Sequence, residues 1–272
     1  MDVLATSSAQ MPVNRALQAR FCEFMPKHEF NYHIHISLKN KFIYVEVPKV
    51  ACSTLKSRLQ AIEAQALGQP PPAKDMETIH NKKLSPLLSP SDIGIEQFDA
   101  LLNDPQIFKF CFVRNPYTRV LSAFLSKLSW KEGKYRKTIA DALDQSIDEP
   151  ITFQQFLQVI EQQSVLEMDP HWRTQSAQLF GQQISYDLIG RFETLEQDWQ
   201  QVLSHMNQQT QPQTAAENRD TPKRRGRKTG ADDKLAKFYA HPSVVKLVQT
   251  IYQEDFKTFQ YSPELPVSSD SI

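Results

Sequence analysis

The chain has 272 residues and a mass of 31.3 kDa. With 40% hydrophobic and 23% charged residues, it is long enough for one substantial core and is not a wholly disordered chain. Its 31 basic residues balance its 31 acidic residues, which argues against bulk electrostatic binding to nucleic acid. Only 7 glycines stand against 17 prolines, so a phosphate loop built from several glycines is not expected.

Three cysteines, Cys22, Cys52 and Cys111, are too few and too widely spaced for a disulfide framework or a zinc site. We therefore expect a reducing compartment and no bound metal. The first residues lack a basic start followed by an apolar run, and no stretch approaches the roughly 18 apolar residues of a membrane helix. These features predict a cytoplasmic protein with no integral membrane segment.

The first structural unit begins with residues 41–47, KFIYVEV, which are rich in β-branched and aromatic side chains. This composition predicts a strand that ends at Pro48. Residues 55–67 then repeat apolar side chains at helical spacing, and Gly68 with the following prolines ends the helix.

The strand-to-helix pattern recurs twice. Residues 107–113, IFKFCFV, form the continuous apolar run of a strand covered on both faces, and 119–128 follow as a helix. Residues 186–193 predict a third strand, followed by an amphipathic helix over 194–206. Repeated units of this kind predict an α/β fold with a central parallel sheet flanked by helices.

The remaining segments differ in character. Residues 129–180 are mostly helical and polar, with an amphipathic helix expected to start at Thr152, and they suit a lid or side lobe. Residues 207–232 are rich in Gln, Thr and Asn and carry a basic cluster at 223–228, so we expect a mobile loop. A helical rhythm resumes over 233–261.

The loop PKVACST, residues 48–54, joins the first strand to its helix. Free amides at the helix start form an anion site together with the charge of Lys49 and the hydroxyls of Ser53 and Thr54. A capped helix with a solvated lysine explains this loop equally well. The loop is not GxxxxGK[ST], and no strand-ending aspartate is evident for magnesium, so a nucleotide triphosphatase is disfavoured.

The second loop favours an anionic ligand. RNPYTRVLSAF, residues 114–124, places Arg114 at the end of a strand and Ser122 in the first turns of a helix. Arg114 can grip a phosphate with two parallel donors, so two neighbouring loops can hold two anionic groups of one ligand. The alternative is an Arg114 that pairs with a surface carboxylate and a Ser122 that only packs.

These two loops resemble the signature elements of sulfotransferases that use 3'-phosphoadenosine 5'-phosphosulfate. The spacing Arg-x-Pro-x-x-Arg-x-x-Ser-x-Phe is met in full in the second loop. Three further segments are similar to the carbohydrate sulfotransferases that include the chondroitin and dermatan 4-O-sulfotransferases: DPHWRTQSAQ (169–178), YDLIGRFETL (186–195) and YQEDFKTFQYS (252–262). The resemblance runs from about Lys41 to Ser262.

The resemblance implies a P-loop-like three-layer sandwich with a central parallel sheet and helical insertions. It divides the chain into an N-terminal extension (1–40), a sulfotransferase domain (41–262) and a C-terminal tail (263–272). It also implies 3'-phosphoadenosine 5'-phosphosulfate as the co-substrate, without a metal. The residues that it assigns to this donor are Pro48, Lys49, Val50, Ala51, Cys52, Ser53, Thr54, Arg114, Ser122, Arg227 and Lys228.

In this class the sulfuryl group passes in line from the donor phosphate to an acceptor hydroxyl, and Lys49 stabilises the departing oxygen. The acceptor hydroxyl needs a base, for which histidine is the first choice. The resemblance favours His80, in TIHNKKL, while His171 is either an alternative base or a packed structural residue. Glu193 is a third candidate, better suited to orient its neighbours.

Animal relatives of this family carry a membrane anchor, and they have extra cysteines after the segment that resembles DPHW. This sequence shows no such anchor and reads LFGQQ after that segment. We therefore expect a carbohydrate, a glycolipid or a small hydroxylated metabolite as the acceptor, and no nucleic-acid partner. Two rival functions stay open: a P-loop-type nucleotide kinase and a catalytically silent nucleotide-binding module. The oligomeric state cannot be read from the sequence.

Overall fold

The computed structural model describes residues 19–128, 133–209 and 229–266. The described chain forms two compact units. The first contains residues 19–47, 51–112 and 179–209, and the second contains residues 48–50, 113–128, 133–178 and 229–266. Arg227, Lys228 and the rest of the basic cluster 223–228 lie outside the described residues.

The first unit is built around a sheet in the order β1-β2-β3-β4. Its strands are β1 (Ile34–Ser37), β2 (Phe42–Val45), β3 (Phe108–Val113, whose last residue falls in the second unit) and β4 (Leu188–Arg191). Its helices are α2 (Lys27–His33), α3 (Cys52–Ala66), α4 (Met76–His80), the 3₁₀ turn η1 (Lys82–Leu84), α5 (Pro90–Ile93), α6 (Ile95–Asn103) and α11 (Leu195–Gln209).

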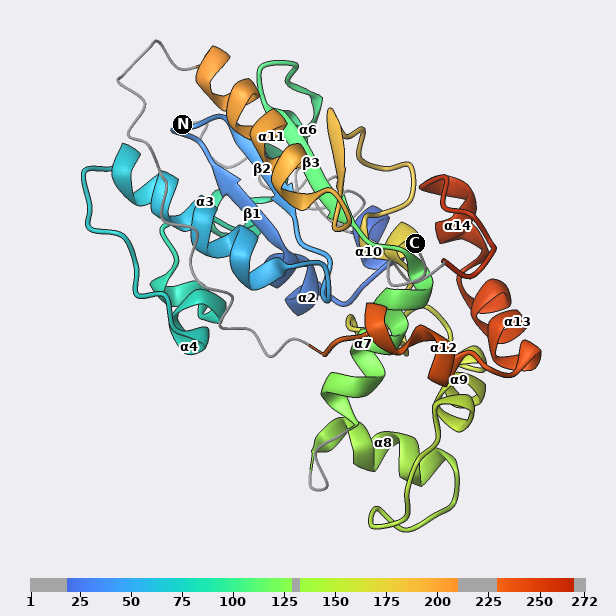
Figure 1. Cartoon of the computed structure of the whole chain (residues 1–272). Coiled ribbons are helices and arrows are strands. Elements are labelled where there is room, and N and C mark those ends of the chain that lie inside the picture. Colours follow the sequence, from blue (N-terminus) through green and yellow to red (C-terminus); the bar gives the residue numbers. More distant parts are fainter. Residues whose placement is uncertain (1–18, 129–132, 210–228, 267–272) are drawn as a thin grey trace. The chain divides into compact units, whose positions relative to one another are not determined.

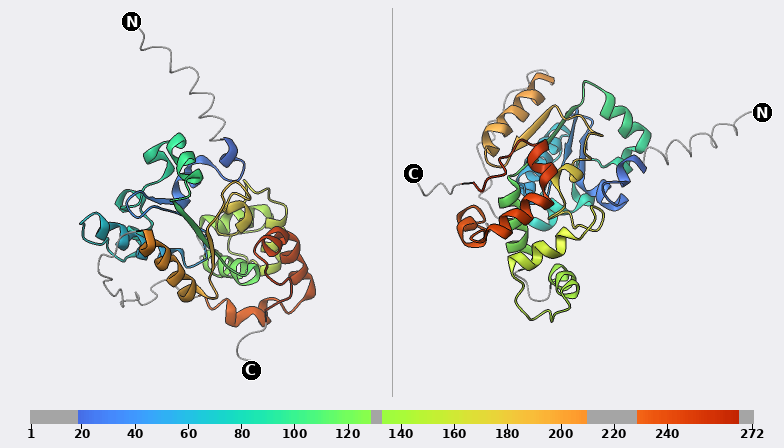
Figure 2. Two further views of the ribbon diagram at one scale, coloured as in Figure 1. Left: turned by 90° about the horizontal axis from the view of Figure 1, so that it is seen from above. Right: turned by 90° about the vertical axis from the view of Figure 1, so that its right-hand side faces the viewer.

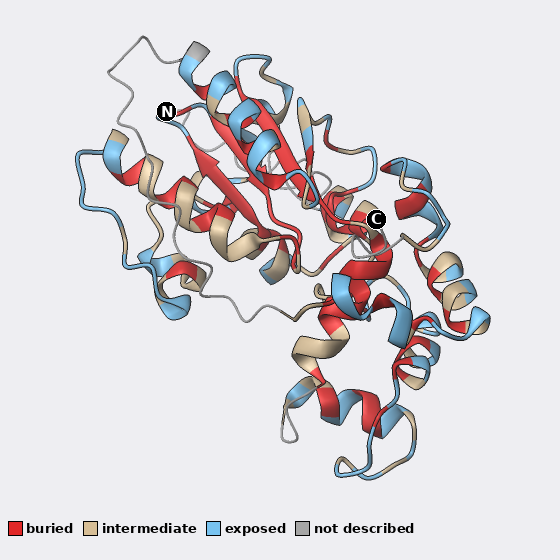
Figure 3. Cartoon of the chain, viewed as in Figure 1, coloured by how far each residue is buried: buried red, intermediate tan, exposed pale blue. Residues whose placement is uncertain are grey.

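The α/β class and the three expected strands are confirmed, and β1 is an addition that the sequence analysis does not predict. β2 and β3 run parallel, with Phe42 opposite Phe108, whereas β1 runs antiparallel to β2, with Ile34 opposite Val45. The sheet is therefore mixed and not purely parallel. Every residue of β1, β2 and β3 is buried, as the unbroken red of these strands shows in Figure 3.

One face of this sheet is aromatic. Tyr44 stacks on Phe110 at 5.3 Å between ring centroids, and Phe108 stacks on His205 of α11 at 4.6 Å. α3 and α11 lie side by side (Figures 1 and 2), where Arg58 of α3 donates to both carboxylate oxygens of Glu196 at 2.8 Å. These two helices begin directly after the loops that follow β2 and β4, so the strand-to-helix pattern accounts for their place in the chain.

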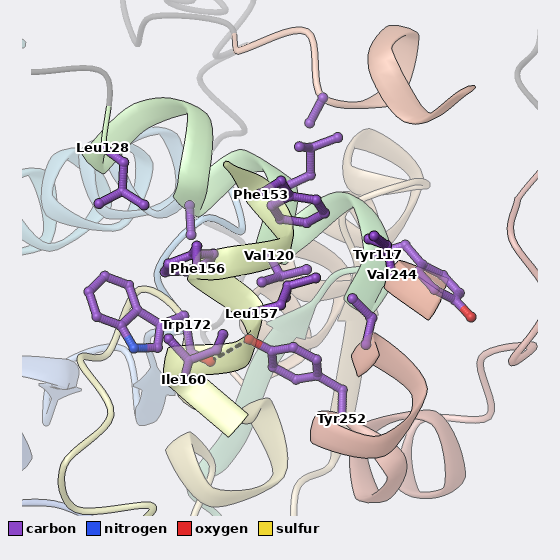
Figure 4. Packing of buried hydrophobic residues seen from close by; sticks show 14 of the residues in the cluster. Tyr117, Val120, Leu128, Phe153, Phe156, Leu157, Ile160, Trp172, Val244 and Tyr252 are labelled. Atoms are coloured by element: carbon purple, nitrogen blue, oxygen red, sulfur yellow. Dashed lines mark hydrogen bonds between the residues drawn. The ribbon is translucent and has the colours of Figure 1, made fainter. Parts of the chain in front are cut away.

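The second unit is helical. Its elements are α7 (Pro116–Lys127), α8 (Lys134–Ala142), α9 (Phe153–Glu161), α10 (Gln175–Gln178), the 3₁₀ turn η2 (Asp232–Lys234), α12 (Leu235–Phe238), α13 (Pro242–Ile251) and α14 (Gln253–Thr258). Its core gathers side chains from α7, α9 and α13 around Trp172 (Figure 4). The hydroxyl of Tyr252 donates to the Trp172 carbonyl at 2.7 Å, which ties the DPHW segment to this core.

Local signals explain where the helices start. α7 begins at Pro116, three residues earlier than expected, because the Asn115 side chain accepts from the Tyr117 amide at 3.0 Å and proline suits the first helical position. Thr152 caps α9 in a capping box with Gln155, as the sequence predicts. Across the described residues, no helix is long and apolar enough to span a membrane.

A buried carboxylate fixes the start of α10. Asp255, on α14, is fully buried and accepts from the amides of Gln175 and Ser176, both at 2.8 Å. The Gln175 side chain in turn exchanges hydrogen bonds with the backbone of Arg114, at 2.9 Å and 2.8 Å. Asp255 thus fixes the start of the Arg114 loop through one intermediate side chain.

Replacement of Asp255 by alanine is expected to lower the free energy of unfolding by about 2–4 kcal/mol, because two buried amides lose their acceptor. The matched control, Asp141→Ala, removes only an exposed pair with Lys137 on α8 and is expected to cost about 0.5 kcal/mol or less. Urea unfolding of both variants measures the difference. Equal costs would contradict a structural role for Asp255.

A second prediction concerns Gly190 on β4. A Cβ atom at this position would lie 2.4 Å from Cε1 of Phe112 on β3, so Gly190→Ala is expected to cost about 1–3 kcal/mol through overpacking. The shorter side chain of Phe112→Leu should relieve the clash, so the double variant should be more stable than the sum of the two single changes implies. Strict additivity in urea unfolding would refute this close packing.

Candidate active site

The backbone of the loop after β2 is strained. Lys49 and Ala51 both have positive φ angles, 72° and 51°, which cost side-chain-bearing residues about 1–3 kcal/mol each. Ala51 is the N-cap residue of α3, and its methyl side chain cannot cap the helix. Ser53 and Thr54 lie inside the first turn, so the capped-helix interpretation of this loop is wrong. Successive amides in such a conformation form an anion-binding concavity.

Two arginines of the second unit hold the start of this loop. Arg119, which is 1% exposed, donates from Nε to the Pro48 carbonyl at 3.1 Å. The same guanidinium donates to the carbonyls of Arg173 and Pro170, at 2.7 Å and 3.1 Å. Arg114 adds a contact of 3.3 Å from Nη1 to the Lys49 carbonyl. The Pro48 backbone and the DPHW segment are therefore both held by the Arg119 side chain, and Arg114 holds the Lys49 backbone.

Arg114 is buried and presents its guanidinium to a carboxylate. Nη2 contacts both oxygens of Asp232, at 3.1 Å and 2.9 Å, and Nε donates to the Thr118 hydroxyl at 2.9 Å. The Asp232 side chain is 58% exposed. Arg114 thus pairs with a surface carboxylate, which was the alternative expected from the sequence. The Asp232 carboxylate places a negative charge at the position predicted for a phosphate.

Two hydroxyl groups of α7, those of Ser122 and Ser126, make polar contacts in this unit. The Lys49 ammonium group donates to the Ser126 hydroxyl at 2.7 Å. Ser122 is buried and accepts from the Thr229 hydroxyl at 3.2 Å. Ser122 therefore takes part in a polar contact and does not merely pack. The second unit contains Lys49, Arg114 and Ser122, which are three of the residues predicted to bind the donor.

In the first unit, His80 at the end of α4 joins a polar network. Its Nε2 atom lies 2.9 Å from the Ser53 hydroxyl, and its Nδ1 atom lies 2.8 Å from the Lys56 ammonium group and 3.1 Å from the Tyr32 hydroxyl. Lys56 also pairs with the buried carboxylate of Glu46 at 3.0 Å. The network thus runs from the end of β2 through α3 to the predicted base.

The charges in this network are set by burial and pairing. Burial opposes ionisation of Glu46, but the Lys56 ammonium group and the His35 hydrogen bond outweigh it and hold the pKa of Glu46 well below its usual value. Burial likewise disfavours a charged Lys56, yet the Glu46 carboxylate raises the pKa of Lys56. Burial, with Lys82 nearby, lowers the pKa of His35 to about 3, and burial lowers the pKa of Lys82 to about 7. Lys56 is therefore a cation and His35 is neutral.

His171 lies in the second unit and has a different partner. Its Nδ1 atom is 2.5 Å from Oδ1 of Asp169, and its backbone amide donates to the same oxygen at 3.0 Å. The side chain is 24% exposed, and its ring packs edge-to-face against Tyr135 at 5.5 Å. Trp172 beside it is buried and donates from Nε1 to Gln163 at 3.0 Å. Trp172 is structural, whereas the His171 ring reaches solvent.

Sequence reasoning missed four charged groups around these candidates: Glu46, Lys56, Asp169 and Asp232. The available signal for Glu46 was a glutamate at the end of an apolar strand. The available signal for Asp169 was its position inside the DPHW segment. Glu193 is exposed just after β4. In the described ranges, no group of three or more histidine, cysteine, aspartate or glutamate side chains is placed to hold a metal ion.

Comparison with known proteins points to one family. The pattern of the sulfotransferase family matches residues 32–262. Carbohydrate sulfotransferase 12 of Mus musculus is 26% identical over 237 residues, which cover 77% of this chain and 55% of that protein. Carbohydrate sulfotransferase 14 of Danio rerio is 32% identical over 184 residues, which cover 64% of this chain and 48% of that protein.

Carbohydrate sulfotransferase 11 of Danio rerio is 26% identical over 255 residues, which cover 85% of this chain and 67% of that protein. The chain thus spans about half the length of the first two of these curated relatives. No solved structure matches it. Since the family pattern covers most of the chain, including both loops described above, the protein belongs to the sulfotransferase family.

Proposed function

We propose that the protein transfers a sulfuryl group from 3'-phosphoadenosine 5'-phosphosulfate to a hydroxyl group of a carbohydrate or glycoconjugate. Membership of the sulfotransferase family supports the reaction, and the names of the relatives, which are carbohydrate sulfotransferases, support a carbohydrate acceptor. The cytoplasmic location stays a prediction, as does the assignment of Arg227 and Lys228 to the donor.

The observation that carries this proposal is the contact between Arg114 and Asp232. The Nη2 atom of the buried Arg114 guanidinium contacts both oxygens of one carboxylate, so this position already accommodates an anionic group with two acceptor oxygens, as a phosphate has. Arg114 also contacts the carbonyl of Lys49, which lies on the strained loop. The Arg114 contacts with Asp232 and with the Lys49 carbonyl support an anionic ligand in the second unit.

The proposed chemistry needs positioning and charge stabilisation. As the sulfuryl group leaves the donor, negative charge grows on the bridging phosphate oxygen, and the Lys49 ammonium group is the residue that we assign to it. Arg114 and Ser122 bind the 3'-phosphate in this proposal. The strain at Lys49 and Ala51 is consistent with a loop that is held ready for its ligand before the ligand arrives.

Titration calorimetry with adenosine 3',5'-bisphosphate, with and without magnesium, tests the donor site. Binding should not need magnesium. Lys49→Ala should weaken it about 10- to 100-fold, because a hydrogen bond to a charged group contributes about 1.5–3 kcal/mol. Arg114→Lys keeps the charge but loses the planar guanidinium, whose other nitrogens contact Thr118 and the Lys49 carbonyl, so it should also weaken binding.

The matched control is Lys137→Ala, an exposed lysine on α8 that pairs with Asp141, which should bind as the unmodified protein does. Absence of binding to folded protein would refute the donor site. Magnesium-dependent binding of ATP in its place would favour the kinase alternative. Transfer from labelled donor to a panel of saccharides then tests the acceptor class.

Asp232 offers a prediction with the opposite sign. If a phosphate replaces this carboxylate on Arg114, Asp232→Asn should tighten binding of adenosine 3',5'-bisphosphate about 1.5- to 5-fold, since an ion pair exposed on one side contributes about 0.2–1 kcal/mol. The same calorimetric titration measures the change. Weaker binding by this variant would show that Asp232 supports the ligand and does not compete with it.

A further inference from the structure

The two candidate histidines have opposite hydrogen-bond partners, and each partner determines which ring nitrogen carries the proton. A neutral imidazole has one nitrogen that donates and one that accepts. Only a nitrogen with a free electron pair can take a proton from a hydroxyl group. The partners of His80 and His171 therefore decide which ring is ready to act as a base.

At His80, Lys56 settles the choice. An ammonium group only donates hydrogen bonds, so its contact of 2.8 Å makes Nδ1 of His80 the accepting nitrogen. Lys56 keeps its charge because the buried Glu46 carboxylate lies 3.0 Å away. The proton of the neutral ring then sits on Nε2, where it donates to the Ser53 hydroxyl at 2.9 Å. Nε2 of His80 is a donor in this arrangement.

At His171 the assignment is reversed. A carboxylate only accepts hydrogen bonds, so the contact of 2.5 Å with Asp169 places the proton on Nδ1. Nε2 keeps its electron pair. A backbone turn requires only the hydrogen bond from the His171 amide to Asp169. Here the imidazole ring binds the same Asp169 oxygen as well. The pair has the arrangement by which a carboxylate orients a catalytic imidazole.

The position of His171 fits this role. Its side chain is 24% exposed, so it is partly open to solvent. Arg119 binds the carbonyls of Pro170 and Pro48, which lie next to His171 and Lys49 in the chain. The Lys49 charge also acts on His171 electrostatically. The predicted base and the cation assigned to the leaving oxygen thus belong to one fixed region of the second unit.

We propose that His171, oriented by the positioning residue Asp169, is the general base of sulfuryl transfer, and that His80, held by Lys56, is a hydrogen-bond donor. This inference rests on the proposed function. It reverses the preference of the sequence analysis for His80. Asp169, Lys56 and Glu46 become positioning residues, since each acts through a histidine or through the group that holds one.

The acceptor hydroxyl gives its proton to Nε2 of His171, and the oxygen uses the freed electron pair to form a bond to sulfur. The bond between sulfur and the bridging phosphate oxygen breaks, and adenosine 3',5'-bisphosphate leaves with that electron pair. The His171 imidazolium, stabilised by Asp169, then releases its proton to solvent.

Burial lowers the pKa of His171 below its usual value near 6.5, the Asp169 hydrogen bond opposes this change, and the charges of Lys127 and Lys49 add to it. Tyr135 is the other group packed on the ring. His171 is therefore neutral and able to accept a proton at neutral pH. Activity should fall as the pH drops through this lowered pKa, because the protonated ring cannot act as a base.

Nitrogen NMR of the full chain labelled at histidine tests the assignment without an acceptor. At pH 7 the signal of His171 should show a protonated Nδ1 and a bare Nε2, and that of His80 should show the reverse. Asp169→Asn should shift the His171 pattern, and Lys56→Met should shift that of His80. The matched control His241→Asn, at the exposed start of α13, should change neither.

Turnover provides the second measurement. With the saccharide that accepts label, His171→Ala should lower kcat about 100-fold or more and abolish the acidic limb of the pH profile. Its binding of adenosine 3',5'-bisphosphate should be unchanged, whereas failure of the unmodified protein to bind this nucleotide would instead refute the proposed function. A bare Nε2 on His80, or an acidic limb that persists in His171→Ala and disappears in His80→Ala, overturns the proposal.

Discussion

The guanidinium group of Arg119 is the contact on which the second unit depends. It is fully buried and donates to three backbone carbonyls that belong to two separate segments, the loop after β2 and the DPHW segment. Buried carbonyls need a donor, so these segments cannot move apart without leaving three acceptors and one charged group unsatisfied. The strain of the loop and the placement of His171 are both maintained by this one side chain.

Regular patterns in the sequence predicted the regular parts of the fold. β3 and α9 were recognised because an unbroken apolar run and an amphipathic pattern each leave a local signature. β1 was missed because it contains His35, whose burial depends on a partner at Glu46 that comes 11 positions later. Such a buried polar pair becomes visible only when the strands are paired.

The candidate site likewise has parts that the sequence predicted and parts that it did not. The two loops were found because their residues are adjacent in the chain, and family membership supports their assignment. The choice between His80 and His171 could not be made from sequence, because it depends on whether an ammonium group or a carboxylate lies beside Nδ1. Lys56 and His80 are separated by 24 positions, and only folding brings them together. A motif therefore names the candidate, and the hydrogen bonds define its chemistry.

The carboxylate of Asp232 has a consequence for what happens when a ligand departs. A buried guanidinium that loses its only anion is left with an uncompensated charge, which is costly in a protein interior. Under the proposed function, a phosphate that leaves Arg114 would be replaced by Asp232, which already contacts this guanidinium. The charge of Arg114 would then stay balanced when the nucleotide departs.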